Sequence, residues 1–293
     1  MVEVLSKCRI CKDTRLVDVI DLGEQIITSR WPVYGDSSTP STKIVLVQCE
    51  GCSLVQLKHT VSGSELYEYE YGYRSGISNT MREHLEEYNK QVQRLACVKE
   101  GDTVLDIGSN DTTFLRYYSD AVQRIGCDPT GKQFREYYKD DVALIPTYFS
   151  KKAIVDTFGE STKFKAVTSI SMFYDLPDPV QFARDIYSVL ENDGVWSLEQ
   201  SYCKTMLERN SIDTICHEHL EYYNIKQIKD IMDRSGFKII HLELNDCNGG
   251  SMRVFVAKRS SAHLEVSVQN YIDAENEMGI HTPSFYKGFM ERG

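Results

Sequence analysis

The segment from Val104 to Leu115 constrains the fold more strongly than any other part of the chain. It begins with an apolar run, which favours a buried strand, and continues at once into Asp106, Gly108 and short polar residues. The apolar residues that follow can open a helix. Glycine permits a tight turn and the close approach of a ligand, and a helix N-terminus offers unpaired N–H groups. Because ligands of open α/β sheets lie at the carboxyl ends of the strands, we expect a small cofactor here.

Strand-like and helix-like segments alternate beyond this point. Further strands are predicted over residues 124–129, 142–146, 164–170 and 195–199, helices over 180–190 and 225–235, and a closing strand pair over 237–242 and 252–257. This order predicts an α/β fold with a doubly wound, Rossmann-like sheet that ends in a hairpin. A helix capped by Asn79 or Thr80 is expected to lead into the first strand. Apolar residues on one face, among them Leu264 and Val268, predict that the tail from Ala262 is helical.

Two C-x2-C pairs lie near the N-terminus, Cys8 with Cys11 and Cys49 with Cys52. Each pair lets two thiolates reach one ion from a single turn, and two pairs complete a tetrahedral site, for which zinc is the usual occupant. Four thiolates leave no open position, so we predict a structural Zn²⁺ and not a catalytic one. Reduced cysteines without a metal are the alternative. The odd number of cysteines and the lack of a signal peptide argue against a disulfide framework.

Tyrosines occupy every second position between residues 66 and 76, namely Tyr67, Tyr69, Tyr71 and Tyr73. On a strand they would share one face. They could pack against a neighbouring domain, or they could form a lid that offers phenol hydroxyls to a substrate. Periodicity alone favours the packing role.

The nature of the cofactor follows from what the loop contains and lacks. It has neither the full G-x-G-x-x-G pattern nor a P-loop lysine, which argues against a pyrophosphate site. Asp128 closes the second strand about twenty residues after Gly108, where a carboxylate can bind both hydroxyls of a ribose. This combination favours S-adenosylmethionine, with NAD as the alternative; Asp128 could also be an ordinary strand-end acid before Pro129. Asp106 would order the turn near the methionine end. We assign to the cofactor Asp106, Gly108, Ser109, Asn110, Asp111, Asp128, Pro129 and Ser171.

The densest group of titratable residues runs from Asp213 to Tyr223 and contains His217, Glu218 and His219. It follows the fifth strand, so it can lie over the carboxyl edge of the sheet. Both histidines are candidates for catalysis, because imidazole is a base near neutral pH and a carboxylate can orient it. A metal site is a second interpretation, but histidines two positions apart diverge on a helix and the H-E-x-x-H pattern is absent. A solvated surface turn is a third.

Together these motifs resemble those of the C-methyltransferases that act on nucleotide-linked deoxysugars. The resemblance rests on the four cysteines, a Y-x-Y-x-S segment, a loop of the form D-I-G-x-N-D-G and an H-E-H-x-x-Y-Y signature. Outside the cysteines the matching residues are Tyr71, Tyr73, Ser75, Asp106, Ile107, Gly108, Asn110, Asp111, His217, Glu218, His219, Tyr222 and Tyr223. The resemblance extends from Cys8 to about Arg259. It implies a class I methyltransferase sheet preceded by a small zinc domain.

The resemblance also implies a reaction on a 4-keto-6-deoxysugar carried by dTDP or a similar nucleotide. A base removes the proton next to the ketone, and the enolate carbon takes the methyl group of S-adenosylmethionine. By the resemblance His219 is the base and Glu218 orients or polarises the site. Tyr222, with Tyr71 or Tyr73, would hydrogen-bond the enolate oxygen or the sugar.

Several positions depart from the family pattern or leave a choice open. Thr112 stands where a glycine is expected, which would reshape the loop. Cys216 stands where some members have a tyrosine, so no hydroxyl role is carried over. Arg253 could meet a substrate phosphate or be a solvated strand residue. Nearly all of the family's C-terminal domain would be missing, so the chain is expected to be truncated or to belong to a branch that dispenses with it.

Charge and hydropathy exclude other classes. The net charge of −10 argues against general nucleic-acid binding, and no apolar run approaches the roughly 18 residues of a membrane span. We expect a cytoplasmic enzyme whose partner is a nucleotide-linked sugar. Residues 1–65 should form the zinc domain, 66–98 the Tyr-rich segment with its helix, 99–260 the cofactor domain and 261–293 a helical tail. The alternative functions are methylation of a sugar oxygen or nitrogen, and a non-catalytic cofactor-binding or zinc interaction module.

Overall fold

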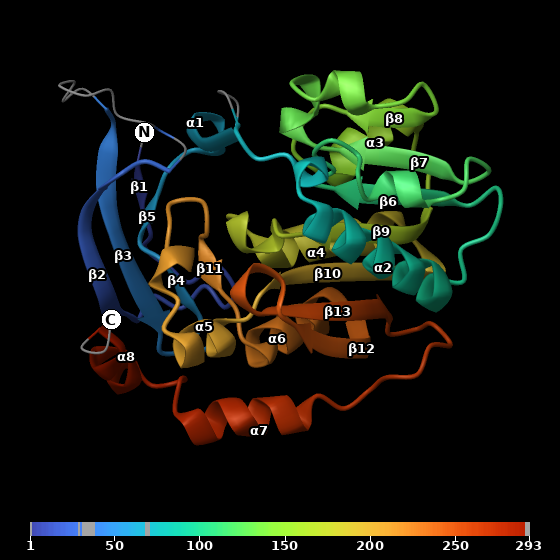
Figure 1. Cartoon of the computed structure of the whole chain (residues 1–293). Coiled ribbons are helices and arrows are strands. Elements are labelled where there is room, and N and C mark those ends of the chain that lie inside the picture. Colours follow the sequence, from blue (N-terminus) through green and yellow to red (C-terminus); the bar gives the residue numbers. More distant parts are fainter. Residues whose placement is uncertain (1, 29, 31–38, 68–70, 291–293) are drawn as a thin grey trace.

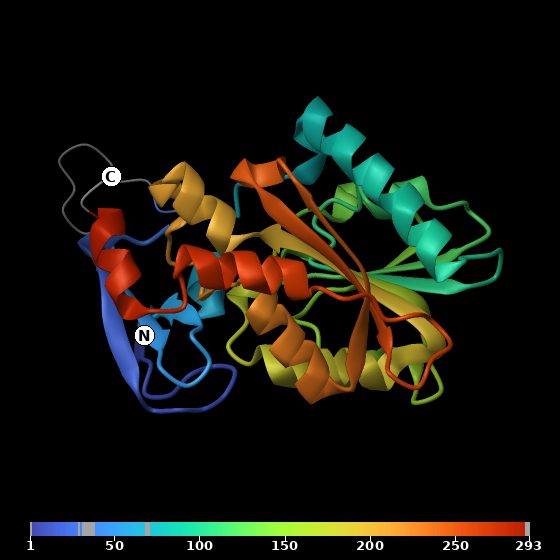
Figure 2. The ribbon, with the colours of Figure 1, turned by 90° about the horizontal axis from the view of Figure 1, so that it is seen from below.

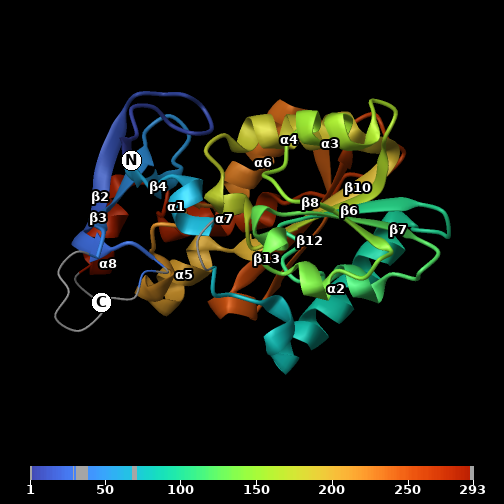
Figure 3. The same cartoon turned by 90° about the horizontal axis from the view of Figure 1, so that it is seen from above.

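Figure 1 shows the computed structural model of the chain, which describes residues 2–28, 30, 39–67 and 71–290. A sheet of seven strands with helices on both faces forms the larger part. A four-stranded sheet stands beside it at the N-terminal end, as Figures 1 and 3 both show. Among the helices of these residues, none is both long and apolar enough to cross a membrane.

The seven-stranded sheet has the order β12-β13-β10-β9-β6-β7-β8. Its strands are β6 (Thr103–Ile107), β7 (Gln123–Cys127), β8 (Val142–Ile145), β9 (Phe164–Ile170), β10 (Leu190–Ser201), β12 (Phe237–Asn245) and β13 (Ser251–Lys258). The five strands from β8 to β10 are parallel, whereas β13 is antiparallel to both of its neighbours. This confirms the predicted Rossmann-like sheet and its terminal hairpin. The carboxyl ends of β6, β7, β9 and β10 therefore meet at one edge.

Helices cover the two faces of this sheet (Figure 3). One face carries α2 (Asn79–Ala96), and the other carries α3 (Lys151–Phe158), α4 (Pro179–Val189) and α6 (Ile225–Ser235). The apolar side of α2 packs Tyr88 and Val92 against Val104 and Phe255 of the sheet. Gly236, with φ of 85°, ends α6 in the left-handed conformation that favours glycine.

The helix expected directly after β6 is absent from the structure. The chain makes only η2 (Leu115–Tyr117), a single 3-10 turn, and Tyr118 is extended again. Asn110 and Thr112 have φ of 48° and 64°, and a left-handed residue cannot continue a right-handed helix. The prediction of a helix N-terminus at the cofactor loop was therefore wrong.

The Tyr-rich segment also differs from the prediction. Tyr67 ends the short helix α1 (Gly63–Tyr67), and residues 71–74 have no regular secondary structure. A 3-10 turn, η1 (Ser75–Ile77), follows. The predicted strand is therefore absent from the described part of this segment, and Tyr69 lies outside the described residues.

Two helix boundaries need correction. Ser78, and not Asn79 or Thr80, caps α2, because its hydroxyl accepts a hydrogen bond from the N–H of Met81 at 3.3 Å. In the tail, helical structure begins only at α7 (Gln269–Met278), and Leu264 is exposed. The stretch before α7 instead forms an irregular link against β12.

The N-terminal sheet has the order β11-β4-β3-β2, and its strands are β2 (Leu16–Ile26), β3 (Ser41–Cys49), β4 (Val55–Leu57) and β11 (Glu221–Tyr222). A short antiparallel pair, β1 (Glu3–Val4) with β5 (His59–Thr60), lies beside it. Strand β11 comes from far along the chain, and it pairs Glu221 with Gln56 and Tyr222 with Val55. The segment that carries the His-Glu-His motif thus completes the sheet of the cysteine-rich region.

The C-terminal tail returns to the same sheet. After α5 (Cys203–Arg209) and the hairpin, α7 and α8 (Pro283–Met290) run back along the molecule, as Figure 2 shows. Helix α8 packs on β2, and Tyr286 and Phe289 are buried in one cluster with Leu46 and Leu57. Both ends of the chain therefore contribute to the core of the N-terminal unit.

Candidate active site

The cofactor side of the site begins at the carboxyl end of β6. Gly108 has φ of 76°, and a Cβ atom at this position would lie 3.1 Å from Cγ of Met172. The positive φ and the closeness of the Met172 side chain therefore both favour glycine at position 108. The preceding acid, Asp106, is buried and accepts a 2.6 Å hydrogen bond from the hydroxyl of Thr168 in β9. Burial raises the pKa of Asp106 to about 7.

The next loop residues hold the Tyr-rich segment. The side chain of Asn110 accepts a hydrogen bond from the N–H of Ser75 at 3.0 Å and donates one to the carbonyl of Tyr73 at 3.1 Å. Asp111 accepts one from the N–H of Gly76 at 3.1 Å. If the side chains of Asn110 and Asp111 contacted a cofactor as predicted, they would have to give up these hydrogen bonds. Contacts made by the main-chain groups of the same residues would leave the bonds intact.

Thr112 has φ of 64°, which is costly for a β-branched residue. This explains why a glycine is expected at this position. The strained conformation is supported by hydrogen bonds, because the hydroxyl of Thr112 donates to the carbonyl of Tyr137 and accepts from Nε of Arg116, both at 3.2 Å. The hydroxyl of the nearby Ser109 lies 2.8 Å from that of Tyr138.

Asp128, at the end of β7, retains capacity for a ligand. Its Oδ2 accepts from the N–H of Asn110 at 2.7 Å, and its Oδ1 accepts from the N–H and the hydroxyl of Thr130 at 2.7 and 2.6 Å. A carboxylate offers about four acceptor positions, so one remains. This fits one ribose hydroxyl of a nucleoside, whereas the predicted contact with both hydroxyls requires one of these bonds to be exchanged. Pro129 opens the 3-10 turn η3 (Pro129–Lys132) directly after it.

Ser171 lies at the same edge, one residue beyond β9. Its φ of 51° is unusual for a residue other than glycine, and its N–H donates to the carbonyl of Glu199 in β10 at 2.7 Å. Its hydroxyl accepts a hydrogen bond from Asn248 at 3.3 Å, which belongs to η7 (Cys247–Gly249). The hairpin loop thus reaches over the carboxyl end of β9.

The His-Glu-His segment comes to this edge through η5 (Phe173–Asp175), the turn that follows β9. The N–H of Leu220 donates to the carbonyl of Tyr174 at 2.8 Å, and the rings of Tyr174 and His219 lie 4.1 Å apart. Nδ1 of His219 lies 2.8 Å from the carbonyl oxygen of Thr214. A carbonyl only accepts, so Nδ1 carries the proton and Nε2 of the neutral ring is the basic atom.

Phenols and carboxyl groups surround this histidine. Burial, followed by the charges of Glu218 and Asp175, raises the pKa of Tyr71 well above its usual range. Burial likewise raises the pKa of Asp175 far above its ordinary value, which His219 opposes. Among the described residues, Oδ1 of Asp175 is buried without a hydrogen-bond partner. The sequence analysis missed Asp175; its place in the short loop after a parallel strand was the available signal.

Two predicted catalytic residues are packed elsewhere. The ring of His217 is buried between Thr28, whose hydroxyl lies 3.3 Å from Nδ1, and the carbonyl of Thr42, which lies 3.3 Å from Nε2. Tyr222 is buried in the apolar cluster of the N-terminal sheet. Residues 216–218 form a bend, and the ring of His217 is directed to Thr28 and Thr42 of the N-terminal unit. Tyr73, in contrast, is half-exposed beside the cofactor loop.

Arg253 is neither a solvated residue nor open to a phosphate. Its guanidinium is buried, donates to Glu199 at 2.7 Å, to Glu87 at 2.8 Å and to Glu243 at 2.9 Å, and stacks 3.9 Å from the centre of the Tyr88 ring. Both expectations for Arg253 were therefore wrong.

His84 completes this network at the end of β10. Its Nε2 lies 2.5 Å from Oε1 of Glu199. Although burial favours the neutral ring, hydrogen bonds to Cys247 and Glu199 raise the pKa of His84 to about 10. The ligand atoms of His84, Glu199 and Cys247 are close enough to hold a metal ion, but the guanidinium of Arg253, 3.4 Å from His84, already supplies the positive charge.

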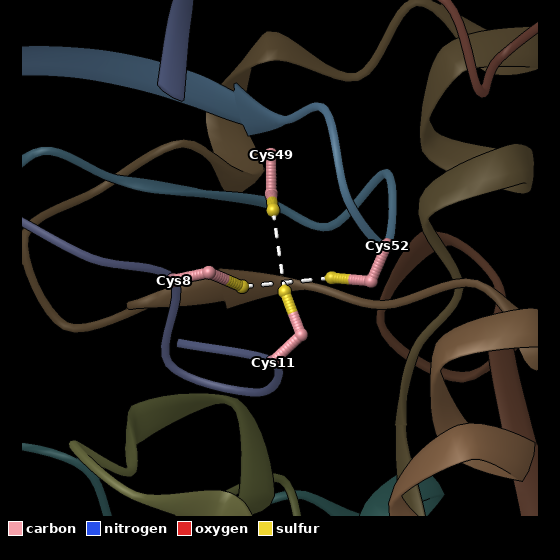
Figure 4. A group of neighbouring side chains, drawn as sticks. All are labelled: Cys8, Cys11, Cys49 and Cys52. Carbon is pink, nitrogen blue, oxygen red and sulfur yellow. Dashed lines mark hydrogen bonds between the residues drawn. The ribbon is translucent and has the colours of Figure 1, made fainter. Parts of the chain in front are cut away.

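The four N-terminal cysteines converge on one point, as Figure 4 shows. Their sulfur atoms all lie within 4.8 Å of one another, and the Cys8–Cys52 and Cys11–Cys49 pairs are 3.5 Å apart. Zn–S bonds of about 2.3 Å in a tetrahedron require sulfur separations of this size. The cysteines therefore fit a structural Zn²⁺, as predicted.

Comparisons with known proteins agree with this geometry. The family model for the methyltransferase domain matches residues 81–242, which is more than half of the chain. The chain belongs to the methyltransferase family. A zinc binding domain model matches residues 8–67 of this methyltransferase, and a model described as a C-methyltransferase C-terminal domain matches residues 246–292. The Rossmann-like sheet and the match to the methyltransferase domain make it a methyltransferase dependent on S-adenosylmethionine.

Among curated proteins, the methyltransferase is similar to the C-methyltransferase NovU of Streptomyces niveus. The two are 24% identical over 294 residues, which cover 99% of this chain and 70% of NovU. Among solved structures, the plantazolicin methyltransferase BpumL in complex with SAH is 10% identical, with a TM-score of 0.48, over 62% of this chain and 86% of BpumL. An S-adenosylmethionine-dependent methyltransferase from Clostridium acetobutylicum is 9% identical, with a TM-score of 0.44, over 60% and 92%.

Proposed function

We propose that the enzyme methylates a carbon atom next to the ketone of a nucleotide-linked keto-deoxysugar. The observation that carries this proposal is the hydrogen bond between Nδ1 of His219 and the carbonyl of Thr214, which leaves Nε2 as a base at the edge where the cofactor lies. An imidazole nitrogen with a free lone pair can remove a proton beside a carbonyl group.

The residues around His219 have separate roles in this proposal. Nε2 takes the proton, and the electron pair of the C–H bond moves toward the ketone oxygen to form an enolate. The phenol of Tyr71 donates a hydrogen bond to that oxygen, since its raised pKa keeps it protonated. Glu218 stabilises the imidazolium. S-adenosylmethionine supplies the electrophilic methyl group to the enolate carbon, and its sulfur keeps the electron pair of the broken bond. Tyr73 lies half-exposed beside the cofactor loop, and His217 and Tyr222 serve packing.

The resemblance to NovU, a C-methyltransferase, and the match to a C-methyltransferase C-terminal domain support carbon as the acceptor. Methylation of a sugar oxygen or nitrogen needs a base too, but it does not need a proton to leave carbon. The two reactions therefore differ in whether a carbon-bound hydrogen exchanges with solvent.

The test uses dTDP-4-keto-6-deoxyglucose and related keto-sugars in D₂O, with S-adenosylhomocysteine bound so that no methyl group can be transferred. We expect deuterium to appear at the carbon next to the ketone, detected by mass spectrometry, and methylation at the same carbon when S-adenosylmethionine is added. Methylation of oxygen or nitrogen without such exchange would contradict the proposal.

A further inference from the structure

One buried side chain, Arg9, joins the zinc knuckle to the segment that carries His219. Arg9 lies between Cys8 and Cys11, the two cysteines of the first C-x2-C turn, and only 4% of the residue is exposed. The turn itself is closed by hydrogen bonds of the main chain, from the N–H of Cys8 to the carbonyl of Asp13 and from the N–H of Lys12 to the carbonyl of Cys8. The metal site thus determines where the side chain of Arg9 begins.

The guanidinium of Arg9 contacts three elements. Nη1 donates to the carbonyl of Leu57 at 2.9 Å and approaches the carbonyl of Leu220 at 3.4 Å. Nη2 donates to the hydroxyl of Thr60 at 2.7 Å. The main-chain N–H of Arg9 also donates to the side chain of Gln56 at 3.0 Å, which fixes the start of the side chain.

Glu221 is the charged partner of Arg9. Its carboxylate is buried, lies 3.5 Å from Nε of Arg9, and has no hydrogen-bond partner within the described part of the chain. Burial raises the pKa of Glu221 well above its ordinary value, and the charge of Arg9 opposes this rise. Loss of Arg9 would therefore leave this buried acid without its counter-charge. Leu220 and Glu221 directly follow His219, and the carbonyl of Leu220 also accepts from the N–H of Leu57 at 2.8 Å.

We propose that Arg9 is a positioning residue for His219. Its side chain fixes the position of residues 220 and 221 relative to the zinc knuckle. The metal site therefore determines the position of the His219 imidazole at the edge of the seven-stranded sheet. The inference rests on the assignment of His219 to catalysis made above. The residues fit this role because the main chain of Arg9 belongs to the knuckle, while its buried side chain contacts Leu220 and Glu221.

The test compares Arg9→Met and Arg9→Lys with Arg15→Met as the matched control, because Arg15 lies in the same unit but is exposed and forms its ion pair with the nearby Asp13. Each variant is assayed for zinc content, for affinity for S-adenosylhomocysteine, for amide hydrogen exchange over residues 214–223, and for the NMR titration of His219, identified with His219→Gln. The readouts need no acceptor substrate.

We expect both Arg9 variants to hold one zinc ion and to bind S-adenosylhomocysteine within about twofold of wild type, while exchange over 214–223 rises about tenfold. The titration midpoint of His219 should shift by about half a pH unit. Arg15→Met should leave all four properties unchanged. If Arg9→Met does not fold, Arg9→Lys carries the test, because it keeps a cation opposite Glu221 but cannot make three divergent contacts.

Wild-type exchange and an unchanged His219 titration in Arg9→Lys, with zinc bound, would overturn the inference. Failure of the proposed function gives a different result. In that case His219→Ala retains methyl transfer, while the exchange and titration of the Arg9 variants still report whether Arg9 positions the segment.

Discussion

The hydroxyl of Thr168 donates a 2.6 Å hydrogen bond to the carboxyl group of Asp106 across the neighbouring strands β9 and β6. The bond lies at the level where the parallel strands end and the cofactor loop begins. It does not offset the cost of burying the carboxyl group, because the pKa of Asp106 still rises from 3.8 to about 7.

The first prediction concerns pH and stability. Between about pH 4 and pH 7 the unfolded chain loses the proton of Asp106 while the folded protein keeps it, so stability should fall as the pH rises, by up to about 4 kcal/mol. Asp106→Asn should flatten this part of the stability profile of the cofactor-free protein, measured by urea unfolding at several pH values. Asp140→Asn, at an exposed carboxylate, is the control. A profile unchanged in Asp106→Asn would contradict the assignment.

The second prediction concerns the strained loop. Thr112→Val keeps the β-branched side chain at positive φ and loses the hydroxyl, whereas Thr112→Gly removes the strain and loses the same hydrogen bonds. Thr112→Gly should therefore be more stable than Thr112→Val by about 1 kcal/mol. Chemical denaturation of both variants measures this difference. Equal stability would show that the loop relaxes without strain.

The third prediction concerns the buried guanidinium. Arg253→Met should lower the free energy of unfolding by about 3 kcal/mol, because it leaves the buried Glu199 with His84 and Asn245 as partners but without the guanidinium. Arg259→Met removes an arginine that is half-exposed, and its effect should stay below about 1 kcal/mol. A small loss in Arg253→Met would mean that His84 is sufficient to neutralise Glu199.

The fourth prediction concerns the proposed base. His219→Ala should lower kcat by a factor of about 10² to 10⁴ while the affinity for S-adenosylhomocysteine changes less than about twofold. Steady-state kinetics and calorimetry measure the two quantities. His263→Ala, at a partly buried histidine whose Nε2 lies 3.0 Å from the carbonyl oxygen of Asp193 outside the site, should have wild-type values. A wild-type rate in His219→Ala would remove His219 from the mechanism.

The sequence predicted the parallel strands and α6 well, because each is specified locally. Strand β9 is an apolar run, and Gly236 supplies the left-handed residue that ends α6. The site could be located for the same reason, since strand ends carry Asp106 and Asp128. Local patterns also predicted the four-cysteine cluster, because each C-x2-C pair is a short local motif.

What the sequence could not give depends on contacts between distant segments. The ring of His217 is held by Thr28 and Thr42, which lie far away in the chain, so spacing could not separate it from His219. The same limitation applies to Arg253, whose partners come from α2, β10 and β12. The missing helix after β6 reflects the left-handed conformation of Thr112, which its residue type disfavours.

The pairing of β11 with β4 has a consequence for the order in which the protein can fold during synthesis. Gln56 leaves the ribosome long before its partner Glu221. The N-terminal sheet therefore remains incomplete until strand β11 has been synthesised. Until then the edge of β4 is exposed and open to wrong pairing. The four cysteines are all synthesised early. Zinc binding by them is therefore suited to stabilise the incomplete N-terminal sheet until β11 is available.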